Sequence, residues 1–555
     1  MLQVHGVPEI PAETERIARL AFPKGSLAMK LRDELGMIYT DEQFTDLFPE
    51  RGQPAESPAR LALVTILQFV EGLPDRQAAD AVRGRIDWKY ALGLDLSDPG
   101  FDYSVLSEFR ARLLAGSAEE RLLTAQLKLF QVCGLVKAGG RQRTDSTHVV
   151  AVIRQLNRLE LVGESLRHAL NELAQLAPDW LATVTPPEWY ERYGRRFDSF
   201  HLPESREKRQ ALAQQIGADG HRLLAAALAP AAPAAVRTTP CLQVLRQIWV
   251  QQYYIDASGD ETIVCMREPG NLPPAAHCIC SPYDLDARYG RHDEQVWVGY
   301  RTHLTESCDP DAEIHVITQV ETVLAPTQDV EVVETIHADL AEQGLKPKQH
   351  YVDAAYLSAD LLVSTAQKEA IELIGPVTKL QNVSWQAKEQ TGYDTAQFQI
   401  DWATKQATCP QGQTSVKWYD NVPDRTGNAG IQINFPAAAC QACATRSACT
   451  RSVKGGRTIR VQPQAQYEAL RQARNEQTTA AFARKYRPRL GIEGTISQAV
   501  RAFELRATRY FGLAKTHLQS VVLAAAINVC RFVDYLAGAG LKSTRTSAFA
   551  VLATG

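Results

Sequence analysis

The sequence predicts an α/β protein whose layered core is assembled from separate parts of the chain. Between residues 280 and 380, strand-like runs rich in β-branched residues alternate with helical segments, which is typical of α/β layers. A further strand-like run lies at 139–154, before a long helical stretch. In both places an aspartate lies on a strand or just past one, where α/β folds place ligands.

The bulk composition limits the kind of protein without identifying its function. With 555 residues, 45% of them apolar, the chain has material for about three or four domains with hydrophobic cores. The net charge of −3 gives no global nucleic-acid signature, so any DNA binding must depend on local patches.

Targeting signals and cysteine usage indicate the compartment. The segment Met1–Gly6 lacks the cationic start and apolar core of a signal peptide. No run approaches the roughly 18 apolar residues of a membrane span. Eleven scattered cysteines fit reduced thiols better than a disulfide framework. We therefore expect a soluble cytoplasmic protein with no membrane partner.

Residues 1–138 are predicted to form a helical DNA-binding domain. Ser57 and Pro58 resemble the N-cap and first-turn proline of one helix. A second helix over 76–92 and a third over 103–114 carry several Lys and Arg residues. Helices joined by a short turn, with a basic helix nearby, suit a helix-turn-helix reader of DNA. A plain helical bundle with a charged surface fits the same pattern.

The first part of the predicted core is the strand at 139–154, which carries Asp145. Carboxylates are depleted in strands, so Asp145 is there either as an edge residue or for chemistry. Residues 155–279 then have a helical pattern and are predicted to be an insertion, with a linker at Ala229–Pro233. This insertion shows no chemistry that the sequence identifies.

Residues 280–380 are predicted to supply the remaining strands of the core. Strand-like runs cover Gln295–Leu304, Glu313–Leu324 and Ile371–Ile374, and a helix covers Glu331–Gln343. A short strand, His350–Val352, places Asp353 just past its end.

Residues 381–462 are predicted to form a β-rich insertion that contains four of the cysteines. They are Cys409, Cys440, Cys443 and Cys449. One close Cys-x-x-Cys pair with two further thiolates is compatible with a tetrahedral structural zinc site. Free thiols in a small β-rich insert are the alternative, because thirty residues separate the first cysteine from the second.

Residues 463–540 are predicted to complete the core, and residues 541–555 to form a disordered tail. Between Arg451 and Lys515 there are fourteen Lys or Arg and four Glu, with no Asp. Glu493 is the only carboxylate between residues 476 and 504, and it precedes a basic helix. An isolated acid among cations suits an enzyme that holds DNA phosphates and a divalent metal. A solvated helix face with one ordinary ion pair is the plainer interpretation.

Three acids therefore have unusual settings, namely Asp145, Asp353 and Glu493. Their spacing in sequence does not bring them together, but adjacent strand ends and a helix packed across them would. Three carboxylates around two divalent cations form the arrangement used for in-line attack on a phosphodiester. Magnesium suits such all-oxygen ligands, and manganese is the alternative ion.

Three segments around these acids resemble the acid motifs of DDE transposases from bacterial insertion sequences, most closely the eleven-eighty-two family. The segments are Thr144-Asp145-Ser146-Thr147, Tyr351-Val352-Asp353-Ala354-Ala355-Tyr356 and Arg489-Leu490-Gly491-Ile492-Glu493-Gly494-Thr495-Ile496-Ser497-Gln498. The resemblance extends over nearly the whole chain. It implies a ribonuclease H-like catalytic core in which the three acids are the metal-binding triad.

The segment around the final acid also resembles a signature of related transposases. That signature has a Tyr, two residues, an Arg, three residues, a Glu, six residues and a Lys, and Tyr486, Arg489 and Glu493 match it. Val500 stands at the Lys position and Arg501 follows it, turned by about 100° on a helix. The resemblance implies DNA contacts by Tyr486 and Arg489, and we add Arg501 and Lys515 to this predicted set.

The implied function is that of a transposase acting on double-stranded DNA, both transposon ends and target. Such an enzyme cleaves a phosphodiester at the element's end and joins the freed 3′-hydroxyl to target DNA with two metal ions. Because two ends are cut together, a homodimer on DNA is expected. A catalytically inactive or domesticated DNA-binding regulator and a stand-alone nuclease are the alternatives.

Overall fold

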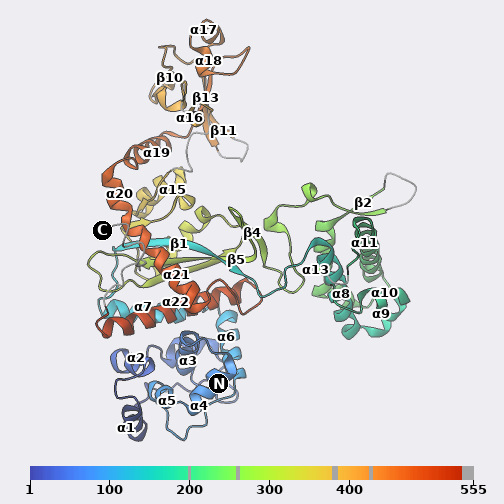
Figure 1. The fold of residues 1–555 in the computed structure, drawn as a ribbon, viewed down its shortest axis with the longest axis vertical. Coiled ribbons are helices and arrows are strands. Elements are labelled where there is room, and N and C mark those ends of the chain that lie inside the picture. Colours follow the sequence, from blue (N-terminus) through green and yellow to red (C-terminus); the bar gives the residue numbers. More distant parts are fainter. Residues whose placement is uncertain are drawn as a thin grey trace.

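The computed structural model describes residues 1–4, 6–197, 202–257, 263–377, 385–389, 391–423 and 429–539. Figure 1 shows the N-terminal helices at one end of the molecule, the cysteine-bearing strands at the other, and a helical arm beside the central sheet. The tail predicted for 541–555 lies outside the described residues.

The central sheet has six strands, and its order is β4-β5-β1-β7-β8 with β6 paired to β5. Its strands are β1 (Arg141–Val150), β4 (Arg288–His292), β5 (Gln295–Ser307), β6 (Ile317–Leu324), β7 (Gln349–Tyr351) and β8 (Glu372–Ile374). β1 is antiparallel to β5, with Asp145 opposite Leu304, and parallel to β7. β8 is parallel to β7, and β6 is antiparallel to β5. The predicted strands are thus confirmed, although β6 begins four residues later than expected.

The N-terminal region is helical, as predicted. Its α-helices are α1 (Ala12–Ala21), α2 (Leu27–Leu35), α3 (Pro58–Val70), α4 (Asp75–Gly84), α5 (Ile86–Leu92), α6 (Ser104–Ala115) and α7 (Arg121–Val132). The hydroxyl of Ser57 accepts a hydrogen bond from the backbone N–H of Arg60 at 3.3 Å, so the predicted N-cap of α3 is confirmed. The single helix expected over 76–92 is instead two helices, because Arg85 has an extended backbone between them.

Helix α22 (Leu513–Leu536) packs against both the sheet and the N-terminal helices (Figure 1). The side-chain amide of Asn528 donates to the carbonyl of Ile317 and accepts from its N–H, both at 2.8 Å, which ties α22 to the start of β6. Among the described residues, α22 alone is long and apolar enough to cross a membrane, which the sequence prediction did not anticipate. However, 83% of its most apolar window is buried inside the fold.

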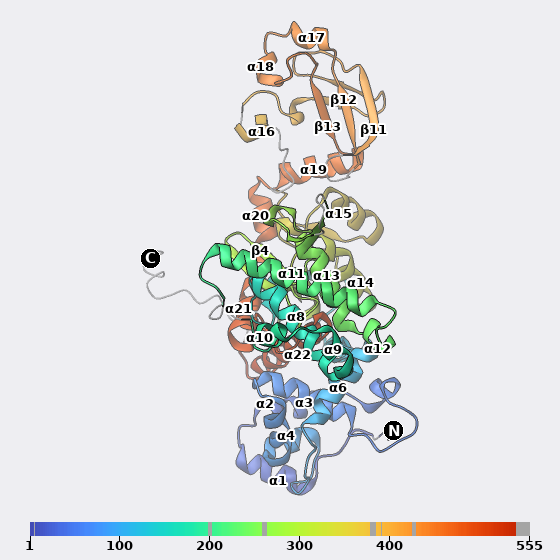
Figure 2. The same ribbon diagram turned by 90° about the vertical axis from the view of Figure 1, so that its right-hand side faces the viewer.

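The helical arm has its own hydrophobic core, and Figure 2 shows its green helices facing the viewer. It contains α8 (Arg158–Leu176), α9 (Pro178–Val184), α10 (Pro187–Tyr193), α11 (Arg206–Leu228), α12 (Ala234–Arg237), α13 (Pro240–Gln252), β2 (Tyr253–Asp256) and β3 (Ile263–Met266). The indole N–H of Trp249 donates to the carbonyl of Gly217 at 2.9 Å, so α13 lies close against α11. The antiparallel pair of β2 and β3 was not predicted, because the whole segment has a helical pattern.

The cysteine-bearing part is β-rich, as predicted, and packs around Phe398, Ile433 and Ile459. Its elements are α16 (Trp385–Glu389), β9 (Gln399–Asp401), β10 (Gln406–Thr408), β11 (Lys417–Pro423), β12 (Ala429–Asn434), α17 (Ala437–Gln441), α18 (Arg446–Cys449) and β13 (Thr458–Val461). β11, β12 and β13 form one three-stranded sheet.

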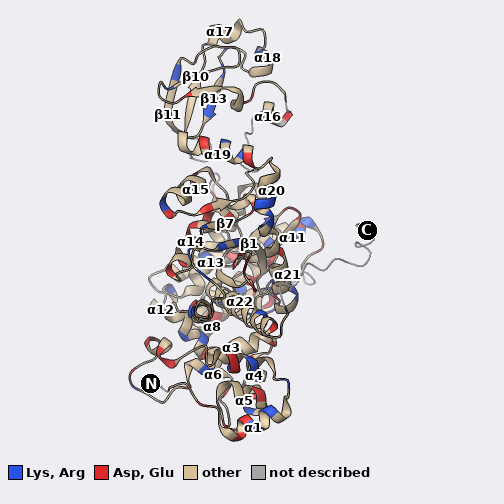
Figure 3. Cartoon of the chain, turned by 90° about the vertical axis from the view of Figure 1, so that its left-hand side faces the viewer, with Lys and Arg blue, Asp and Glu red and all other residues tan. Residues whose placement is uncertain are grey.

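Five further helices complete the fold around the sheet. They are α14 (Val333–Glu342), α15 (Ala359–Ser364), α19 (Gln464–Glu476), α20 (Ala480–Tyr486) and α21 (Gly491–Phe503). α19 and α20 are separate helices, because the hydroxyl of Thr479 accepts the N–H of Phe482 and so caps a new helix. Figure 3 shows blue Lys and Arg residues on α20, next to the strands of the core.

Candidate active site

Asp145 lies in the middle of β1 and forms an ion pair with Arg489. Its carboxylate is 2.9 Å from Nη2 of Arg489 and accepts the backbone N–H of Ser146 at 2.8 Å. Burial raises the pKa of Asp145 to about 6, although Arg489 and the Ser146 N–H oppose that shift. The negative charges of Asp353 and Asp329 raise it further. Burial and neighbouring acids therefore make ionised Asp145 costly without a cation.

Asp353 follows β7 and caps a short 3₁₀ turn, Ala354–Tyr356. Its carboxylate accepts the backbone N–H of Ala355 at 2.7 Å, so the local hydrogen bond fixes the side chain at the strand end. Because β7 is parallel to β1 and pairs with it, Asp353 acts electrostatically on Asp145. These two acids lie near each other, as expected of neighbouring strands.

Glu493 lies in the first turn of α21, which packs across β1. Its side chain is 67% exposed, and one carboxylate oxygen is 3.7 Å from Nη1 of Arg489. Tyr486 lies among all three acids. Burial raises the pKa of its hydroxyl to about 12; Arg489 opposes this, whereas Asp353, Asp145 and Glu493 add to it. Arg489 thus pairs with both Asp145 and Glu493, and Tyr486 lies within the electrostatic field of all three acids.

Arg489 and Tyr486 are both occupied in this arrangement. Arg489 is only 6% exposed and lies between Asp145 and Glu493, while its Nε is buried without a hydrogen-bond partner. The Tyr486 hydroxyl donates to the carbonyl of Val352 at 3.1 Å. Among the described residues, no three His, Cys, Asp or Glu side chains are grouped as a preformed metal site.

The other two predicted DNA contacts lie at the surface. Arg501 is exposed in the last turn of α21, and Lys515 is exposed in the first turn of α22. Val500, at the position of the family lysine, packs against the hydrophobic core. A lysine there would point its ammonium group toward apolar side chains, whereas Arg501 is exposed to solvent.

A second charged cluster lies under the same helix and was missed in the sequence. It consists of Arg143, Glu306, Thr495 and Arg531, which we call the sealed cluster. The Glu306 carboxylate is fully buried and accepts Nε of Arg143 at 2.7 Å, Nη1 of Arg531 at 2.8 Å and the hydroxyl of Thr495 at 2.6 Å. Burial raises the pKa of Glu306, but the two guanidinium groups outweigh it and hold that pKa below its ordinary value.

The sealed cluster connects the elements that carry the candidate acids. Arg143 precedes Asp145 by two residues on β1, and Thr495 follows Glu493 by two on α21. Arg143 also donates to the carbonyl of Pro488 at 2.6 Å. A Cβ atom at Gly491 would lie 1.9 Å from Nη1 of Arg143, so only glycine permits this approach. The sequence signals of this contact were Arg143, directly before the first acid motif, and Gly491, within the third.

The four predicted zinc ligands lie around one small cavity of about 30 Å³, lined by Cys409, Cys440, Cys443 and Cys449. The N–H of Gln413 donates to the sulfur of the first at 3.3 Å, and the N–H of Arg457 donates to that of the second at 3.4 Å. Burial raises the pKa of Cys449; Arg457 opposes this, and the other three thiols add to it. All eleven cysteines, each described, are free thiols.

Most cations of the N-terminal helices are used inside the protein. Arg85 pairs with Asp87, Arg110 pairs with Asp75, and Lys89 donates to two main-chain carbonyls. Several cations of the predicted helix-turn-helix region therefore have partners within the protein, some of them at its surface, such as Arg83 with Asp80.

Two family models match parts of the chain. The model described as Transposase DDE domain matches residues 408–533, and the one described as Transposase domain (DUF772) matches residues 19–112. These matches support a DDE transposase. The first match includes Glu493 but neither Asp145 nor Asp353, and neither description names the eleven-eighty-two family. No curated protein and no solved structure matches the chain.

Proposed function

We propose that this protein is an insertion-sequence transposase of the eleven-eighty-two family, which cleaves DNA at the element's ends and joins them to target DNA. The observation that carries the proposal is that Arg489 forms ion pairs with both Asp145 and Glu493, while Asp353 lies close enough to raise the pKa of Asp145. The two transposase matches agree with it. Double-stranded DNA, transposon ends and target, is the substrate.

The strand order supports a ribonuclease H-like core for this enzyme. Three successive antiparallel strands, β1, β5 and β6, are followed by β7 and β8, both parallel to β1. Asp145 lies on the central strand and Asp353 at the end of its parallel neighbour. The helical arm and the β-rich part are insertions into this core in the proposal.

The residues present fit two Mg²⁺ or Mn²⁺ ions. Asp145, Asp353 and Glu493 offer only carboxylate oxygens, the ligands that hard cations prefer. Asp145 and Glu493 already pair with one positive charge, that of Arg489. The three acids would hold the ions, which when bound supply an activated water and stabilise the leaving 3′-oxygen.

The protein's own side chains position the DNA. Arg489 pairs with Asp145 in the DNA-free chain and with a backbone phosphate in the complex, where its planar guanidinium donates two parallel hydrogen bonds. Tyr486 is held beside it by the carbonyl of Val352. Arg501 and Lys515 add exposed positive charge on α21 and α22. Water attacks first, and the freed 3′-hydroxyl then attacks target DNA.

A joining assay tests this function against the two alternatives. Purified protein is incubated with Mg²⁺ and duplexes carrying the inverted repeats that flank the gene. Joined product is expected. Cleavage without joining would instead indicate a stand-alone nuclease, and a shifted but uncut duplex would indicate a regulator. We expect a homodimer on paired ends, acting at the bacterial nucleoid in the cytoplasm.

A structural zinc ion is the second part of the proposal, held by Cys409, Cys440, Cys443 and Cys449. Four thiols around one cavity, two of them accepting backbone N–H bonds, suit zinc's preference for tetrahedral sulfur ligands. Metal analysis should find about one zinc per chain, reduced by Cys443→Ser but not by Cys133→Ser, whose thiol lies elsewhere at the surface. Wild-type protein free of zinc would refute the site.

A further inference from the structure

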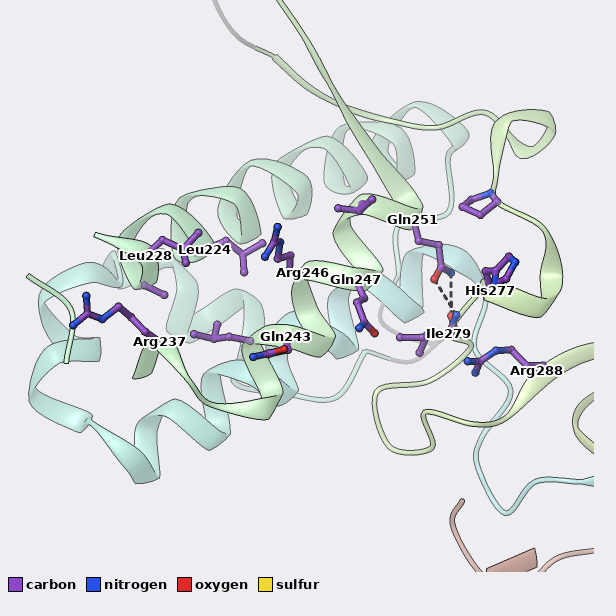
Figure 4. A pocket seen from close by; sticks show the side chains of 14 residues that line it. Leu224, Leu228, Arg237, Gln243, Arg246, Gln247, Gln251, His277, Ile279 and Arg288 are labelled. Carbon is purple, nitrogen blue, oxygen red and sulfur yellow. Dashed lines mark hydrogen bonds between the residues drawn. The ribbon is translucent and has the colours of Figure 1, made fainter. Parts of the chain in front are cut away.

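The helical arm contains an open groove of about 530 Å³ that the proposed chemistry does not use. It lies between α11, α12 and α13, and the segment leading into β4 closes one end (Figure 4). The amide of Gln251 exchanges hydrogen bonds with the backbone of Ile279 at 2.9 and 3.0 Å, so this end is rigidly built. Leu228 and Val250 line the groove and remain 64% and 63% exposed.

The charged residues that line this groove are all basic. Arg237 and Arg246 are exposed, and neither forms an ion pair with any described carboxylate. Arg288 also lines the groove, and it donates to the main-chain carbonyls of Ala276 and Ala287 at 3.0 and 3.2 Å. Its charge is therefore fixed in place. Most surface arginines of the N-terminal helices, by contrast, have acidic partners.

The spacing of these charges indicates what the groove binds. Figure 4 shows Arg237 at one end, Arg246 near the middle, and Arg288 with His277 at the other end. A single phosphate ion would require cations that converge on one point, whereas a chain of phosphates suits cations spread along a line. Gln243 and Gln247 add exposed amides between them, and Gln and Arg side chains are common donors to DNA phosphates.

We propose that this groove binds the sugar-phosphate backbone of DNA, at a site separate from the cluster around Arg489. The apolar side chains of Leu228 and Val250 contact deoxyribose, and the arginines neutralise successive phosphates. Arg288 begins β4, and β4 pairs with β5, the neighbour of the strand that carries Asp145. The inference rests on the proposed function, because the groove gives the protein a second contact with the DNA that is bound near Arg489.

Salt-dependent binding of an arbitrary 40-base-pair duplex tests the groove in the full-length protein. No divalent cation is added, so cleavage does not contribute. The Arg237→Gln/Arg246→Gln variant should flatten the slope of log affinity against log salt by about 2, roughly one per lost contact. The matched control is Arg206→Gln/Arg222→Gln, which removes two exposed charges from α11 outside the groove. It should leave the slope unchanged.

Two outcomes would overturn this inference. One is equal slopes for the wild type, the groove variant and the control, when thermal denaturation shows that all three proteins are folded. The other is full displacement of the duplex by millimolar inorganic phosphate in the wild type but not in the groove variant, which would make the groove a site for small anions. Failure of the joining assay with an intact slope difference would count against the transposase function and not against the groove.

Discussion

Two charged clusters contact α21. Both are built mainly of carboxylate and guanidinium groups, but they differ in how far their acids are exposed to solvent. On one side of the helix, Glu493 is 67% exposed and lies 3.7 Å from Arg489, which also pairs with Asp145. On the other side, Thr495 contacts Glu306, which is 0% exposed and held by two arginines. The open cluster consists of Asp145, Asp353, Glu493 and Arg489, three acids and one cation, and two of its acids pair with that cation. The sealed cluster has one acid between two cations.

This difference indicates separate roles for the two clusters, one in stabilising the fold and the other in binding a ligand. The sealed cluster satisfies its acid completely, so it has no capacity for a ligand and serves to fix α21 against β1. The open cluster has more acids than cations and includes a buried Nε without a partner. An excess of carboxylates near one cation favours binding of further positive charge. The sealed cluster therefore holds rigid the helix that carries Glu493, one of the three proposed metal ligands.

The largest expected effect is on catalysis by the open cluster. Asp145→Asn, Asp353→Asn or Glu493→Gln should each lower the cleavage rate by about 10³-fold, since loss of a metal ligand removes several kcal/mol of transition-state stabilisation. DNA binding should remain. Single-turnover cleavage and gel-shift titration measure the two effects. Glu504→Gln, at the end of the same helix, is the control. Retained cleavage in any of the three variants removes that residue from the triad.

The sealed cluster should show the opposite pattern, with a stability effect. Glu306→Gln leaves two buried guanidinium groups without their anion, which costs about 3–5 kcal/mol in the free energy of unfolding. Urea denaturation measures this loss. Glu493→Gln, an exposed position, should change stability by less than about 0.5 kcal/mol. Equal losses of stability in the two variants would contradict the claim that only the sealed cluster stabilises the fold.

The pH dependence of stability should sharpen the comparison further. Because the pKa of Asp145 is raised to about 6, the folded state holds this proton where the unfolded state, with an ordinary pKa near 4, has lost it. Stability from this group is therefore present below about pH 4 and is lost as pH rises through 6, by at most about 3 kcal/mol.

Unfolding of the wild type and Asp145→Asn without divalent cations, from pH 4 to 7.5, measures this contribution. The difference between the two curves should fall over that window, and it includes the Arg489 ion pair, which forms only as Asp145 ionises. A flat difference would show that Asp145 is solvated as an ordinary surface acid.

The smallest expected effects concern the exposed cations beside the open cluster. Arg501→Gln and Lys515→Gln should each weaken DNA binding modestly and reduce its salt slope by about 1, since each contacts at most one phosphate. Fluorescence anisotropy across a salt series measures the slope. Lys24→Gln, in the N-terminal region, provides a charge-matched comparison. If it changes the slope as much as Arg501→Gln does, then general charge explains the effect and a specific contact does not.

The elements that carry the candidate acids were predictable from sequence. Local patterns place Asp145 on a strand, Asp353 after a strand and Glu493 in the first turn of a helix, and the structure has each of them there. β-branched residues and helix caps are local signals, so a short window of sequence contains them. The break at Arg85 was not predicted, because the helical pattern continues through Gly84.

The sealed cluster could not be predicted, because its meaning depends on distant partners. Glu306 is separated from Arg143 by 163 positions and from Arg531 by 225, and nothing near it in sequence distinguishes it from a surface acid. The pairing of Arg489 with Asp145 is non-local too, across more than 300 residues. Tertiary contact also decides that Arg110 of α6 pairs with Asp75, 35 positions earlier in the chain.

Iron-mediated cleavage of the polypeptide tests most directly whether the three acids share bound metal. Fe²⁺ replaces Mg²⁺ in the purified protein, ascorbate and peroxide are added, and fragment ends are mapped by mass spectrometry. The account predicts cuts near Asp145, Asp353 and Glu493 together, all lost in Asp145→Asn and all suppressed by excess Mg²⁺. Cuts near only one of these acids, or cuts unchanged in that variant, would contradict it.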